Sequence, residues 1–199
     1  MDVQRLLWDL ADKYAPAARA SYRRPERFDH AGGLVVAEGR VKWETPWCTE
    51  GGFSHALPAG SHPVYAGSFV GTPDDRDPDG IRHVVGMIVI PLVEPARIAA
   101  AKWDDDGYDD IHLIEGYAVL WGGEARRTAL PFSDERSTFF AGVRERSTPG
   151  PVGDWVEAVL DRETGANAFV FPVDAENVDG FEIVDDGGTL LCLVLTAYS

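Results

Sequence analysis

The spacing of apolar residues changes along the chain, from a helical period at the start to mostly extended patterns beyond it. Near the N-terminus the apolar positions form one helical stripe: Val3, Leu6, Leu7, Leu10 and Tyr14. Asp2 stands at a capping position, and Pro16 discourages continuation of a helix. The pattern therefore predicts an amphipathic helix over residues 2–14.

The clearest strand signals are two apolar runs, Val64–Val70 and Ile81–Leu92. The residues between them, 71–80, are dense in Gly, Pro and Asp, which favour turns. The two runs therefore predict a β-hairpin. Its second arm is almost entirely apolar, which is typical of a central strand covered on both faces.

The rest of the chain mixes strands with short helices. Strands are predicted over residues 34–37, 41–43, 111–121, 168–173 and 189–197, and an extended segment over 181–183. Short helices are predicted over residues 95–102 and 133–141, and a second amphipathic stripe precedes Gly165: Trp155, Val156, Val159 and Leu160. The expected fold class is α+β, a mostly antiparallel β-sheet arranged like a sandwich or half-barrel, with an N-terminal helix and two or three short helices. Residues 1–28 would form that helix and a connection, and residues 29–199 a single β-rich domain.

The net charge of the chain limits the classes of molecule that it is expected to bind. The 199 residues include 33 Asp and Glu against 18 Lys and Arg, a formal net charge of −15. Binding to nucleic acid is disfavoured, because phosphate contacts need clustered cations. An acidic surface suits a basic protein partner, although negative charge also serves solubility alone. No signal peptide or apolar stretch of membrane-spanning length is visible, so a cytoplasmic protein without a membrane partner is expected.

Catalytic motifs are missing from the sequence. The histidines occur without HxH or HExxH spacing: His30, His55, His62, His83 and His112. Ser54, His55 and Cys48 do not make a triad, because no nucleophile elbow or oriented third partner is visible. We therefore expect no catalytic residues and lean against an enzyme.

Residues 75–80 match the start of a calcium loop, with Asp75, Asp77 and Asp79 at alternate positions before Gly80. Calcium prefers six to eight oxygen ligands, and three such carboxylates offer part of that set. The twelfth position is Gly86 instead of a bidentate Glu, so an ordinary acidic hairpin loop is the competing interpretation. Calcium is the one cofactor that the sequence suggests.

A second acidic run, expected to be an exposed loop, is the candidate docking surface for a partner: Asp104, Asp105, Asp106, Tyr108, Asp109 and Asp110. A solvated face is the commoner role of such a run, and docking is favoured over a metal site because successive loop carboxylates diverge. Trp43 and Trp47 are added to the docking set as aromatics of a recognition loop, with capping of a sheet edge as the alternative.

Several short segments resemble an uncharacterised bacterial family, domain of unknown function 4241. The matching segments are Gly33–Val36 with Gly39–Val41, Leu57–Val64, Gly116–Val119 with Phe132–Glu135, and Asn167–Phe171 with Asp185–Leu190. The chain departs from the family pattern at residues 119–123, where an acidic position is lost, and at residues 172–177. The resemblance implies a β-rich fold without an agreed reaction, and an association with secreted-toxin systems.

These observations predict a non-catalytic protein-binding protein of the immunity or inhibitor type, whose partner is a basic protein such as a toxin. The alternative is an enzyme or small-ligand-binding protein whose site is assembled from residues distant in the sequence. That alternative predicts a deep pocket with perturbed titratable groups.

Overall fold

The computed structural model describes residues 1–19, 21–37, 39–44, 51–70, 83–104, 107–112, 117–129 and 155–199, with the backbone alone at 83, 108–112, 117 and 129. The helices are α1 (Val3–Tyr14), α2 (Pro95–Ala100) and α3 (Gly123–Ala129). The strands are β1 (Arg27–Val36), β2 (Val41–Glu44), β3 (Gly60–Val70), β4 (His83–Pro91), β5 (Tyr108–His112), β6 (Tyr117–Gly122), β7 (Val156–Val159), β8 (Asn167–Pro172), β9 (Asn177–Val184) and β10 (Leu190–Tyr198).

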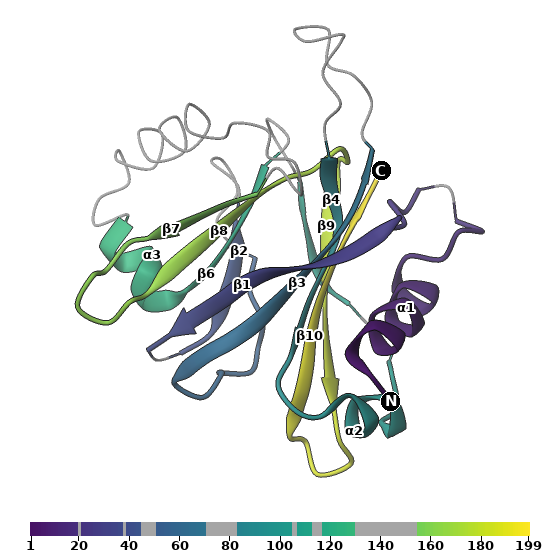
Figure 1. Ribbon diagram of the computed structural model, residues 1–199, viewed down its shortest axis with the longest axis horizontal. Coiled ribbons are helices and arrows are strands. Elements are labelled where there is room, and N and C mark those ends of the chain that lie inside the picture. Colours follow the sequence, from purple (N-terminus) through teal and green to yellow (C-terminus); the bar gives the residue numbers. More distant parts are fainter. Residues whose placement is uncertain are drawn as a thin grey trace, which may run out of the picture.

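The strands of the described residues form two antiparallel sheets. A six-stranded sheet has the order β1-β3-β4-β10-β9-β5, and a four-stranded sheet has the order β2-β6-β8-β7. In Figure 1, α1 and α2 lie beside the larger sheet, whereas α3 lies at the far side of the smaller one. The predicted α+β class with an antiparallel, sandwich-like arrangement and a few short helices is confirmed.

Three apolar clusters hold these layers together. The largest lies between the sheets and includes Leu34, Trp43, Phe169 and Leu195. A second fills the space between the larger sheet and the helices α1 and α2, and a third lies under α3 on the outer face of the smaller sheet. Both sheets are therefore covered on two faces, which explains why several strands are apolar almost throughout.

The predicted N-terminal helix is confirmed, and its start is set by its cap. The Asp2 side chain accepts a hydrogen bond from the backbone N–H of Arg5 at 2.8 Å, which satisfies a donor left free at the helix end. The buried stripe is the one expected from the spacing: Leu6, Leu7, Leu10, Ala11 and Tyr14. α1 thus covers the larger sheet and shares its core, so residues 1–14 pack on the β-rich part of the chain.

The predicted hairpin is also confirmed, because β3 pairs with β4 in antiparallel register. β4 lies between β3 and β10, and its side chains enter both apolar clusters, with Ile88 facing the other sheet and Met87 facing the helices. The register shifts between Gly67 and Ser68, which makes Gly86 the unpaired residue of a β-bulge. The residues joining the two strands lie outside the described part of the chain.

Other predictions of elements were wrong in informative ways. Residues 111–121 do not form one strand, because β5 belongs to the larger sheet and β6 to the smaller one. The stripe before Gly165 is strand β7, in which half-buried and exposed residues alternate and Val156 pairs with Val170. A short apolar run fits either period, and pairing with β8 decides in favour of the strand. α3 was not predicted, and the helix predicted over residues 133–141 lies outside the described residues.

Among the residues that the structure describes, none belongs to a helix long and apolar enough to cross a membrane.

Candidate functional site

The acidic run begins at the end of the α2 region with Asp104, whose side chain is 58% exposed. Its carboxylate lies 2.9 Å from Lys102 Nζ, and its backbone carbonyl accepts a hydrogen bond from the Tyr14 hydroxyl at 3.1 Å. α1 therefore anchors the backbone of Asp104, while the carboxylate stays at the surface. Asp105 and Asp106 lie outside the described residues.

The next part of the run is a strand. Tyr108, Asp109 and Asp110 belong to β5, which pairs with β9 at the edge of the larger sheet. The prediction of a loop is wrong for these three residues, because they belong to an extended strand: Tyr108 pairs with Gly180, and Asp109 and Asp110 lie at a register shift before Ile111 pairs with Val178. The acidic segment therefore lies along a sheet edge, which holds an extended backbone in a fixed direction.

Trp43 does not join this surface. Its side chain is 1% exposed, and its ring packs at 4.5 Å from the ring of Phe53 between the two sheets. A Cβ atom on Gly180 would lie 2.3 Å from the Trp43 ring, so glycine is needed there for the ring to fit. The prediction that Trp43 belongs to an exposed recognition loop is therefore wrong. Trp47 lies outside the described residues.

The calcium prediction concerns Asp75, Asp77 and Asp79, which also lie outside the described residues, and it stays a prediction. Within the ranges that the structure describes, no group of three or more His, Cys, Asp or Glu side chains is placed to hold a metal ion.

The structure brings together a polar cluster that the sequence does not reveal. Glu182 of β9 has a side chain that is only 3% exposed. Its carboxylate accepts a hydrogen bond from the Ser54 hydroxyl at 2.7 Å and one from the backbone N–H of His55 at 2.9 Å, and it also contacts His55 Nδ1. The His55 ring is 40% exposed. The buried carboxylate thus fixes the orientation of a half-exposed imidazole.

The segment that carries Ser54 and His55 bridges the two sheets. The backbone N–H groups of Phe53 and Leu57 bond to the carbonyls of Val41 and Gly39, at 3.0 and 3.1 Å, along the edge next to β2. Glu182 holds the same segment from the larger sheet. The cluster of Ser54, His55 and Glu182 therefore connects the two sheets, and it is also a candidate site for acid–base chemistry.

The geometry of this cluster differs from that of a nucleophilic triad. In a triad, the acid bonds one ring nitrogen and the serine bonds the other. Here the Ser54 hydroxyl lies 3.3 Å from His55 Nδ1, the nitrogen that already contacts Glu182. Ser54 is therefore a partner of the acid, and both groups approach the same ring nitrogen of His55, Nδ1.

Sequence reasoning named Ser54 and His55 but missed Glu182, which lies 127 residues away from His55. The one available signal is the alternation in Phe181-Glu182-Ile183. Phe181 and Ile183 pack under the helices, so Glu182 faces the other sheet. A charged residue in that position has to find partners, but the sequence does not say which.

A second buried carboxylate belongs to Glu44, which is 1% exposed. It accepts hydrogen bonds from Arg126 Nε at 2.7 Å and from Trp121 Nε1 at 3.0 Å. Burial raises the pKa of Glu44, while the hydrogen bond and the charge of Arg126 oppose that rise. This arrangement ties α3 to the smaller sheet, since Arg126 belongs to α3 and Glu44 ends β2.

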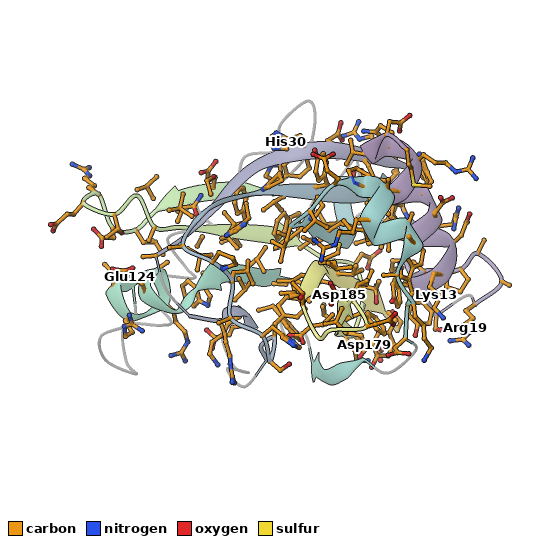
Figure 2. The ribbon with its side chains drawn as sticks, turned by 90° about the horizontal axis from the view of Figure 1, so that it is seen from below. Lys13, Arg19, His30, Glu124, Asp179 and Asp185 are labelled. Atoms are coloured by element: carbon orange, nitrogen blue, oxygen red, sulfur yellow. The ribbon has the colours of Figure 1, made fainter. Side chains whose placement is uncertain are left out.

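Many surface cations are engaged by carboxylates of the chain itself. Ion pairs join Arg5 to Asp9, Arg24 to Asp12, Arg27 to Asp29, Arg97 to Asp185 and Lys102 to Asp104. Figure 2 shows charged side chains over the whole outline, from Glu124 near one end to Arg19 near the other. These pairs reduce the capacity of the surface to bind an anion.

Comparisons with known proteins give no match: no family model, no curated protein and no solved structure is similar to this chain.

Proposed function

We propose that this chain is a non-catalytic binding protein of the immunity or inhibitor type, whose partner is a basic protein. The observation that supports the proposal is the excess of negative charge on the chain. The net charge is −15, and several cations of the described surface are already paired with carboxylates of the chain. The remaining excess of carboxylates suits a cationic partner and repels an anionic one.

The docking surface in this proposal is the acidic edge, defined as Asp104 together with strand β5. Tyr14 holds the backbone of Asp104, and β9 pairs with Tyr108, Ile111 and His112 on either side of the two other aspartates, so the surface is partly ordered before a partner arrives. Carboxylates on an ordered edge would cover cationic groups of the partner, such as those that bind a phosphate. Long-range attraction would make association fast and sensitive to salt.

The test is affinity capture of partners from the native organism at low and high salt. The tested variant combines Asp104→Asn, Asp109→Asn and Asp110→Asn. The control combines Glu26→Gln, Glu157→Gln and Glu163→Gln, which make the same change in net charge at exposed positions next to β1 and on or after β7, away from β5. We expect the wild type and the control to retain a basic protein at low salt and the tested variant to lose most of it.

Association rates with the recovered protein then separate the contribution of the acidic edge from that of the net charge. We expect the tested variant to associate at least about tenfold more slowly than the control at low salt, because steering depends on the local field. Recovery of no basic protein would refute the proposal. Equal binding by both variants would move the docking surface away from the acidic edge.

A second candidate is acid–base chemistry at His55, and the observation that favours it is the buried carboxylate of Glu182. Catalytic histidines are oriented by such a partner. We would expect hydrolysis of a simple activated ester, such as p-nitrophenyl acetate, to fall at least about tenfold in His55→Gln and in Glu182→Gln but not in Ser54→Ala. Hydrolysis that stays equal in all three variants and the wild type would exclude this candidate.

A further inference from the structure

We infer that the groove between the N-terminal ends of α1 and α2 receives an apolar side chain of the basic partner, with a neighbouring Lys or Arg of that partner at Glu94. The inference rests on the proposed function, because it specifies how the same partner would be recognised. The groove has a volume of about 350 Å³, and its lining includes Val3, Pro63, Tyr65, Pro91, Glu94 and Pro95.

The lining of the groove is mainly apolar and is held in shape. Proline residues have a fixed φ and lack a backbone donor, so the three that line the groove present a rigid surface without free N–H groups. The Tyr65 ring packs at 5.3 Å from the ring of His30, which restricts its rotation. A site already formed before binding loses little entropy when a ligand enters.

Two polar groups at the groove have no side-chain partner among the residues that the structure describes. Glu94 is exposed and makes no side-chain hydrogen bond or ion pair within the part of the chain that the structure describes. The Tyr65 hydroxyl likewise has no hydrogen-bond partner among those residues. This contrasts with Arg97 on the next helical turn, which is already paired with Asp185 at 2.6 Å.

This combination defines the chemistry of the occupant. The apolar part of the lining favours an apolar side chain, while the exposed carboxylate of Glu94 favours a cation beside it. Half-buried tyrosines with a free hydroxyl are frequent anchors of protein interfaces, because they offer apolar area and a hydrogen bond together. The net charge of −15 favours a cationic segment over an acidic one.

The test uses nuclear magnetic resonance of the isotope-labelled full chain with three capped pentapeptides. The first has leucine at its centre, arginine on either side and glycine at both ends. The second replaces leucine with serine, and the third replaces both arginines with glutamate. We expect the first peptide to shift the backbone amides of Val3, Tyr65 and residues 92–94. The serine peptide should bind about tenfold more weakly, in keeping with burial of one leucine side chain, and the glutamate peptide should cause no shifts.

Variants of the chain give an independent measurement. Glu94→Lys should weaken binding of the leucine peptide about fivefold, whereas Glu163→Lys, an exposed site on the β7–β8 hairpin with the same charge change, should weaken it less than about twofold. Equal binding of the leucine and serine peptides, with shifts away from the groove, would overturn the inference and leave the proposed function standing. Shifts of the groove amides on raising the protein concentration alone would show that a second copy covers the groove, and would also overturn it.

Discussion

At the scale of single residues, Glu44 and Glu182 are carboxylates that the fold keeps away from water. Each is held by hydrogen bonds, but their partners differ in kind. Glu44 faces the permanent charge of Arg126, whereas Glu182 faces the imidazole of His55 and the hydroxyl of Ser54. A buried carboxylate without a partner costs several kcal/mol, so removing either set of partners is expected to harm the fold more than removing the acid itself.

Glu44 allows a prediction about pH. Its raised pKa means that the folded chain binds this proton more tightly than the unfolded chain, so ionisation of Glu44 lowers stability as the pH rises from the unfolded pKa through the folded one. Glu44→Gln stays neutral and keeps an acceptor for Trp121. We expect the free energy of unfolding of the wild type, relative to this variant, to fall as the pH rises from about 4 to about 8. Urea unfolding across that range measures it.

The control for this experiment is Glu163→Gln, which removes an exposed carboxylate. Its difference from the wild type should change little over the same range. The opposite result would be a wild type that becomes more stable than Glu44→Gln as the pH rises. It would mean that the effect of Arg126 on the pKa of Glu44 outweighs the effect of burial.

At the scale of elements, one amide connects the two sheets near β1. Asn167 of β8 is 1% exposed. Its side chain accepts a hydrogen bond from the backbone N–H of Val35 and donates one to the carbonyl of Gly33, each at 2.8 Å. It also donates to the Glu157 carboxylate at 2.7 Å. Asn167 thus satisfies backbone groups on the outer edge of β1, which that edge strand would otherwise leave unpaired.

Replacement of this residue tests the connection. We expect Asn167→Ala to lower the free energy of unfolding by about 2–3 kcal/mol, because it removes the partner of the part-buried backbone groups of Gly33 and Val35. The matched control is Glu157→Gln, which keeps an acceptor for Asn167 and should lose less than about 1 kcal/mol. Chemical unfolding with urea compares the two. Equal losses would show that the contact with Glu157, and not the contacts with β1, carries the effect.

At the scale of the whole molecule, local sequence patterns predicted those elements whose formation depends mainly on neighbouring residues. The stripe ending at Tyr14, with Asp2 before it, defined α1, and the apolar run in β4 predicted a central strand. Neither inference needed a residue far away in the sequence. The α+β class followed from the same signals.

Features that depend on distant pairing were not predictable in this way. His55 and Glu182 meet because β9 lies near the bridging segment, and nothing near either residue indicates the other. Trp43 is buried because it packs over Gly180, so its exposure could not be judged from its neighbours in sequence. The division of residues 108–122 between two sheets has the same origin, since the partners β9 and β8 both come later in the chain.

The position of β10 has a consequence for synthesis on the ribosome. This strand follows all the other strands in the sequence, yet it lies in the middle of the larger sheet, between β4 and β9. Until residues 190–198 have been translated, the inner edge of the apolar strand β4 lacks its partner, and β9 cannot join the sheet through it. A nascent chain therefore exposes an aggregation-prone edge until β10 has emerged from the ribosome, so chaperones that cover this edge during that interval are expected to raise its yield.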